Sequence, residues 1–156
     1  MQHLGGWLPR HGWSSLGLLT FCAFLVGCSS HQANLQQEQS GLKPLALFYG
    51  QFQGQRGRPP ASEAEFKEHL RSMTPQDLAA WGVTDLDSVF VSSRDNQPYV
   101  VLYGDAAKNA PRGPADSPVI AYEKVGVGGK RFVASVLGAV EEVDEERFKQ
   151  LVPTAP

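Results

Sequence analysis

Cysteine is scarce in this chain of 156 residues, which contains only Cys22 and Cys28. Because both lie near the amino terminus, the rest of the chain can form neither an intrachain disulfide nor a metal site built from cysteines. Long apolar runs are also missing. The longest, Leu16–Val26, has 11 residues, whereas a membrane-spanning helix needs about 20.

An excess of positive charge is absent as well. The chain has 14 Lys and Arg against 16 Asp and Glu, a formal net charge of −2. The two signs are interspersed, without the basic stripe of a nucleic-acid-binding surface. We therefore expect no nucleic-acid partner.

Sets of residues that signal catalysis are missing too. The sequence has no Gly-x-Ser-x-Gly elbow, and His69 has no Cys or His partner at metal-binding spacing. The acidic pairs Glu141-Glu142 and Glu145-Glu146 are better interpreted as a solvated strand end and a helix start than as an acid/base pair. We expect no enzyme active site, no cofactor and no resident metal.

The residues around Cys28 carry a signal. The run Leu16–Val26 has the length of the 7–15-residue core of a secretory signal peptide. Leu25, Val26 and Gly27 then lead directly into Cys28, and this arrangement resembles the lipobox of bacterial lipoproteins. The resemblance implies cleavage before Cys28, a diacylglyceryl group on its thiol and acylation of the new amine. The alternative is an ordinary signal peptide, or an uncleaved short anchor, with a cysteine there by chance.

The lipobox sets the expected location. One acyl chain gives marginal membrane binding and each buried CH₂ adds about 0.8 kcal/mol, so three chains would make the attachment nearly permanent. In the lipoprotein family an Asp after the cysteine favours the inner membrane, whereas this chain has Ser29. We expect a lipid-anchored protein of the cell envelope, at the outer membrane facing the periplasm rather than at the inner membrane.

The pattern divides the chain into three parts. Residues 1–27 are the predicted signal peptide, residues 28–41 a lipidated, polar tether, and residues 42–153 one domain. Removing 27 residues from 156 leaves 129, which suits one compact domain with a tether. Fully extended, the 13 residues after Cys28 would reach about 45 Å.

Apolar spacing predicts an amphipathic helix over Leu42–Gln53, with Pro44 in its first turn. Gly54, Gly57 and the Pro59-Pro60 pair are expected to end it.

Two shorter helices are predicted next. Ala61–Met73 opens with the capping box Ser62–Glu65. Thr74–Gly82 holds a short third helix, with Leu78 and Trp81 pointing inward.

The sequence then changes to a strand-like pattern. The expected strands are Ser88–Ser92, Tyr99–Tyr103, Pro118–Glu123 and Phe132–Val136, with Val140–Val143 as a candidate fifth. The expected connections are a hairpin turn at Arg94–Pro98, an exposed loop at Gly104–Ser117, a glycine-rich loop at Lys124–Lys130 and a turn at Leu137–Ala139. Asp144 is expected to cap a last helix, Glu145–Leu151. The prediction is an α+β domain: N-terminal helices packed on an antiparallel sheet of four to five strands, then a short C-terminal helix.

Two stretches carry a family resemblance. The first comprises Leu42-Lys43, Leu45, Phe52 and Gly57-Arg58-Pro59-Pro60. The second comprises Tyr122-Glu123-Lys124, Gly128-Gly129-Lys130-Arg131 and Gly138-Ala139-Val140-Glu141. Together they resemble bacterial prepilin-like proteins related to type II secretion pseudopilins, over about half of the domain. The resemblance implies a pilin-like globular domain.

The chain departs from that family at three places. Leu137 stands where the family has an Asp, Val127 stands near the family's His, and the hydrophobic pilin N-terminus with its early Glu is missing. A lipid is predicted in its place, so the resemblance does not imply assembly into a pilus. We expect a non-catalytic module that binds or scaffolds an envelope protein, accessory to a secretion or pilus-like apparatus.

A second class of function stays open: a periplasmic domain that binds a small ligand, calcium or a glycan, or a minor hydrolase. The loop Asp105–Ser117 and the glycine-rich loop Lys124–Lys130 could flank a cleft. The glycine-rich loop is not a P-loop, because Arg131 follows Lys130 where Ser or Thr is needed.

Calcium would need carboxylate oxygens, for which Asp85, Asp87 and Asp105 are weak candidates. An EF-hand loop starting at Asp85 fails, because Phe90 stands where glycine is required and Asn96 where glutamate is required. Caps and turns are the simpler role for these residues.

Overall fold

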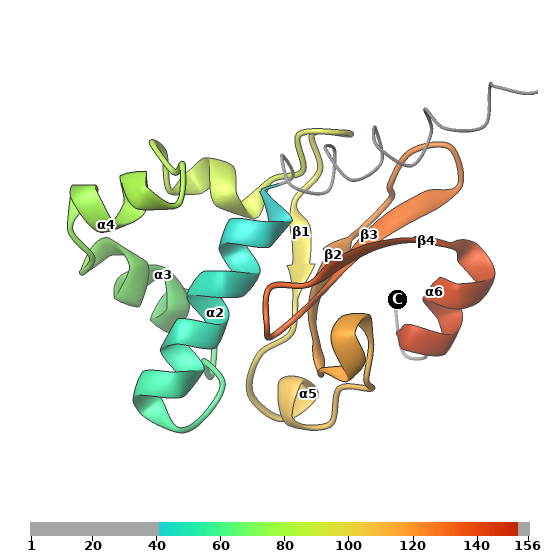
Figure 1. Ribbon diagram of the computed structural model, residues 1–156, viewed down its shortest axis with the longest axis horizontal. Helices are drawn as coiled ribbons and strands as arrows, with labels where there is room; N and C mark the ends of the chain where they lie inside the picture. The colour runs from blue at the N-terminus through green and yellow to red at the C-terminus, as the bar shows by residue number, and fades with distance from the viewer. Residues whose placement is uncertain (1–40, 153–156) are drawn as a thin grey trace, which may run out of the picture.

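The computed structural model describes residues 41–152, which place helices on both faces of one antiparallel sheet (Figure 1). The helices are α2 (Leu42–Arg56), α3 (Glu63–Arg71), α4 (Pro75–Ala80), α5 (Gly104–Lys108) and α6 (Glu145–Leu151), with 3-10 turns η1 (Asp87–Phe90) and η2 (Pro114–Asp116). The strands are β1 (Tyr99–Val101), β2 (Val119–Glu123), β3 (Lys130–Ser135) and β4 (Val140–Asp144), paired antiparallel in that order. The predicted α+β class is confirmed, with four strands in the described part.

Helix α2 forms because its apolar side chains recur at helical spacing and share one face. Its buried residues are Leu42, Leu45, Ala46, Phe48, Tyr49 and Phe52. Pro44 lies in the first turn, where its missing N–H costs nothing. The helix runs past the predicted end at Gln53, because Gly54 stays helical and only the left-handed Gly57 ends it, donating its N–H to the Gln53 carbonyl oxygen.

The next two helices begin at the predicted caps. The Ser62 hydroxyl accepts a hydrogen bond from the Glu65 N–H, but the Glu65 carboxylate accepts from the Ala61 N–H rather than from Ser62. In α4 the capping box of Thr74 and Asp77 is complete. The inward position predicted for Trp81 is wrong: its side chain is 47% exposed and meets the Phe48 ring only edge-on.

The sheet separates two apolar clusters (Figure 1). On one face, α2 and α3 cover a larger cluster that includes Ile120, Phe132 and Ala134. On the other face, α6 covers a smaller cluster, in which the rings of Tyr122 and Phe148 pack edge to face at 5.2 Å. Since both faces are covered, all five residues of β2 are buried.

The strand predicted at Ser88–Ser92 is wrong, and the hairpin built on it is reduced to its turn. Residues 87–90 form η1. The predicted turn at 94–98 is present: a bridge joins Val91 to Pro98, and the Ser92 N–H donates to the Gln97 carbonyl oxygen at 2.9 Å. Val89 and Phe90 are both buried in η1, where the Phe90 ring packs edge-on against the Phe66 ring at 5.9 Å.

The remaining differences concern element ends. β1 stops at Val101 instead of Tyr103, and the predicted exposed loop 104–117 contains α5 and η2. β3 ends at Ser135, one residue before the prediction. The candidate fifth strand exists as β4, and Asp144 caps α6 by accepting the Arg147 N–H.

Candidate functional site

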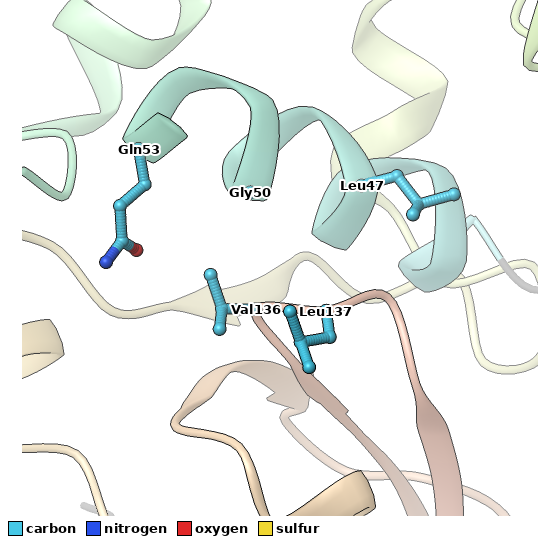
Figure 2. A pocket seen from close by; sticks show the side chains of 5 residues that line it. All are labelled: Leu47, Gly50, Gln53, Val136 and Leu137. Atoms are coloured by element: carbon cyan, nitrogen blue, oxygen red, sulfur yellow. The ribbon is translucent and has the colours of Figure 1, made fainter. Parts of the chain in front are cut away.

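A shallow groove of about 420 Å³ lies between α2 and the β3–β4 turn. Figure 2 shows its lining: Leu47, Gly50 and Gln53 from α2, facing Val136 and Leu137 from the turn. Leu137 is 68% exposed. The lining offers aliphatic carbon and one amide but no titratable side chain, so this surface can hold an apolar group and supplies no acid or base.

Two glycines set the width of this groove. A Cβ on Gly50 would lie 2.5 Å from the Val136 carbonyl oxygen, so only glycine lets the helix approach the turn this closely. Gly138 has a φ of 79°, and a Cβ there would lie 2.5 Å from Leu47 Cδ2. The predicted turn at 137–139 is confirmed. Its left-handed φ favours glycine at 138, and a Cβ there would also force the Leu47 side chain to shift.

A buried carboxylate lies toward the opposite end of the sheet. Glu123, at the end of β2, is 1% exposed. Its oxygens accept hydrogen bonds from the Ser92 hydroxyl at 2.9 Å and the Phe132 N–H at 2.8 Å. Arg94 Nη1 lies 3.7 Å from Glu123 and 3.0 Å from Glu142. The Arg94 guanidinium also stacks on the Phe132 ring at 4.1 Å.

This Glu123 cluster (Ser92, Arg94, Glu123 and Glu142) is a closed arrangement. Both carboxylate oxygens of Glu123 already have partners in the protein, and the residue is inaccessible to solvent. Its chemical effect is to fasten the 92–98 turn onto the sheet, since a buried charge requires such partners. Sequence reasoning missed this cluster. The available signal was a lone Glu closing the apolar run VIAYE.

The glycine-rich loop is a tight hairpin turn. Val127 and Lys130 exchange backbone hydrogen bonds at 2.9 and 3.1 Å around Gly128 and Gly129, which both have positive φ. The Gly126 N–H donates to Asp95 Oδ2 at 2.9 Å, so a carboxylate occupies that amide. The glycine-rich loop therefore closes the hairpin between β2 and β3.

The two loops expected to flank a cleft lie far apart. The segment 104–117 joins the end of β1 to the start of β2, whereas the glycine-rich loop follows the end of β2. They therefore lie at opposite ends of the same strand, and the expectation that they border one cleft is wrong.

The three calcium candidates have local roles. Asp85 Oδ1 accepts the Asp87 N–H at 3.2 Å, and Asp87 opens η1. Asp105 lies in α5 and pairs with Lys108 at 2.9 Å, which lowers the pKa of the Asp105 carboxyl. In residues 41–152 no three His, Cys, Asp or Glu side chains gather as metal ligands.

Other titratable groups lie within the apolar cores or, like the half-buried His69, at their edge. The His69 ring meets the Phe52 ring edge-on at 5.1 Å, and burial, with Arg56 nearby, lowers the pKa of His69. Burial raises the pKa of Tyr49, whose hydroxyl donates to the Leu102 carbonyl oxygen at 2.7 Å. Burial and then the charge of Glu123 raise the pKa of Tyr99 to about 12.

The predicted lipidation residue Cys28, with the signal peptide and the tether before Gly41, lies outside the described residues. Within the described range, no helix has the length and apolarity needed to cross a bilayer.

Comparison with known proteins adds no assignment: no family model, no curated protein and no solved structure matches this chain.

Proposed function

We propose that this chain is a lipid-anchored protein of the bacterial envelope whose domain binds or scaffolds another envelope protein without catalysis. The observation that carries the proposal is the sequence Leu25-Val26-Gly27-Cys28 at the end of a short apolar run. The position of the domain supports it. Leu42, the first fully buried residue of the described range, begins α2 directly after a polar stretch long enough to serve as a tether.

The link to a secretion or pilus-like apparatus is a proposal that rests on the quoted resemblance. Several residues of the first stretch, such as Leu45 and Phe52, are core residues of α2. Others set the chain path, since Gly57 ends α2 and Gly138 makes the β3–β4 turn. The likeness therefore concerns how the domain packs, and the partner has to be found by experiment.

Mass spectrometry of the native protein tests the anchor. The amino-terminal peptide is expected to begin at Cys28 and to carry three acyl chains. Cys28→Ser should leave the leader attached and abolish the modification. An unmodified thiol, or an intact leader in the wild-type protein, would contradict the proposal.

Membrane fractionation tests the destination. The wild-type protein is expected in the outer membrane, and Ser29→Asp should move it to the inner membrane. The same distribution for both proteins would contradict sorting by Ser29.

Site-specific photocrosslinking in intact cells tests the protein partner. A crosslinker in place of Leu137, the exposed apolar residue beside the groove, is expected to give one reproducible protein adduct. A crosslinker in place of Glu146, exposed on α6, is the matched control. Adducts that are absent under several growth conditions, or equal at both positions, would contradict a specific partner at the groove.

A further inference from the structure

The glycine-rich loop holds two apolar side chains out in solvent. Val125 is 57% exposed and Val127 is 46% exposed. Lys124 and Lys130 flank them, and the Lys130 side chain is 59% exposed. Exposed aliphatic side chains between lysines suit a bilayer interface, where the apolar groups enter the headgroup boundary and the ammonium groups meet anionic lipid.

The tether joins the domain at this same end. A Cβ on Gly41 would lie 3.5 Å from the Ser88 carbonyl oxygen and 3.6 Å from that of Val91. The chain continues from Val91 into the turn whose Asp95 accepts the Gly126 N–H. One turn therefore connects the start of α2 to the glycine-rich loop. Figure 1 shows both at the upper side of the view, with the β3–β4 turn below.

We propose that the loop tip, Val125 to Gly129, rests on the phospholipid bilayer to which the chain is anchored. The proposal rests on the lipid anchor of the proposed function. Residues 29–41 span at most about 45 Å, so an anchored domain stays beside the surface. Tethering makes the contact intramolecular, and a weak interaction is then sufficient to orient the domain.

Charge favours the glycine-rich loop over the neighbouring η1 as the surface that contacts the bilayer. The η1 side carries Asp85 and Asp87, which anionic headgroups repel. Lys124 and Lys130 lie at the loop instead. Two carboxylates offset the charge of Lys130 in part: Glu142, 3.8 Å away and 21% exposed, and Asp144, which stands opposite Lys130 in the β3–β4 pairing. Lys124 lies beyond that pairing.

Fluorescence quenching tests the contact in the mature lipidated protein. Cys22 is removed with the leader and the Cys28 thiol carries lipid, so an introduced cysteine is the one free thiol. Val125→Cys and Val127→Cys are labelled with an environment-sensitive dye. The proteins are reconstituted in vesicles of phosphatidylethanolamine and phosphatidylglycerol that contain a spin-labelled lipid. Leu137→Cys, at the other end of the sheet and more exposed than either valine, is the control.

Several-fold stronger quenching is expected at 125 and 127 than at 137. Replacing phosphatidylglycerol by phosphatidylcholine, or introducing Lys124→Glu with Lys130→Glu, should reduce it. Equal quenching at all three positions, or stronger quenching at 137, would overturn the loop contact.

The two proposals fail separately. Mass spectrometry of the same sample shows whether Cys28 is acylated, and an unacylated protein refutes the anchor. In that case the chain from Cys28 onward is coupled through its thiol to a maleimide lipid, and hydrogen exchange is measured on the same vesicles. Slower exchange of amides 124–130 on vesicles supports the loop contact, and unchanged exchange refutes it.

Discussion

The two ends of the sheet are held together by different kinds of interaction. At the β3–β4 turn, Gly50 and Gly138 let α2 and the turn approach until backbone and aliphatic carbon touch. At the other end, the Glu123 cluster fastens the 92–98 turn to the sheet through ionic and hydrogen-bonding contacts. The first end depends on the absence of side-chain volume and the second on the pairing of a buried charge.

This difference predicts different failures. A Cβ added at a close contact can be accommodated by small shifts of its neighbours, so the loss of stability depends on the size of the clash. A buried charge that loses its partner cannot move into solvent. Removal of the partner therefore lowers the stability more than a steric clash does. The difference between the two ends also suits the proposed roles. The Glu123 cluster lies at the end near the tether and supports the glycine-rich loop, which has to keep its shape.

The largest effect is expected from Arg94→Ala, which leaves Glu123 buried without its cation. The free energy of unfolding should fall by about 3–5 kcal/mol, the range for breaking a buried ion pair. Denaturant unfolding of the mature chain measures it. Glu142→Ala is the control. It removes the more exposed partner of Arg94 and leaves the buried Glu123 with its cation, so it should cost less than Arg94→Ala. Equal losses would contradict the ranking.

A smaller effect is expected from Gly50→Ala at the packed end. Alanine favours a helix by about 1 kcal/mol over glycine, but its Cβ would lie 2.5 Å from the Val136 carbonyl oxygen. We expect a net loss of about 1–3 kcal/mol from overpacking. Gly54→Ala is the matched control on the same helix. Nothing lies within 4 Å of its Cβ, so it should stabilise the domain by about 0.5–1 kcal/mol. A gain at both positions would contradict the close approach.

The two turns allow a finer comparison. Gly128 and Gly138 both have positive φ, so alanine at either should cost about 1–2 kcal/mol in backbone strain. Gly138→Ala should cost more, because its Cβ also meets Leu47, whereas the surroundings of Gly128 are open. Adding Leu47→Ala to Gly138→Ala should remove the excess, which a double-mutant cycle measures. Additive effects would show that Leu47 is not the obstacle.

Much of the fold could be predicted from local signals. The caps at Ser62, Thr74 and Asp144 and the left-handed Gly57 act within a few residues, so the sequence carries them directly. The failures arise where distant packing decides. In 88–92 the β-branched pattern favours a strand, but Phe90 has to reach the Phe66 ring at 5.9 Å, and a 3-10 turn permits this.

Less of the candidate site could be predicted. The groove depends on Gly50 of α2 meeting Val136, residues far apart in the chain, and no local pattern announces that contact. Glu123 looks like an ordinary polar strand end until β3 and the 92–98 turn enclose it. The lipidation signal at Cys28 is the reverse case, because it is read from contiguous residues and involves no folded structure.

The smallest effect should come from charge at the exposed corner between α2 and α3. The Arg58 guanidinium holds both oxygens of Glu65, at 2.6 and 3.1 Å, and the Ala61 N–H donates a further hydrogen bond. The Arg58 bond first, then the Ala61 bond, lowers the pKa of Glu65 to about 2. A carboxyl with a lowered folded pKa adds stability above its unfolded value, about 4.3, and loses it as the pH falls toward 2.

Glu65→Gln tests this corner against the buried end. Unfolding midpoints of the variant should lie below those of the wild type near neutral pH, and the two should converge as the pH falls from about 4 toward 2. The difference should stay well below that of Arg94→Ala, because solvent screens an exposed pair. NMR titration of the Glu65 carboxyl gives its pKa directly. An ordinary pKa, or curves that stay parallel in acid, would show that Arg58 does not hold this carboxylate in solution.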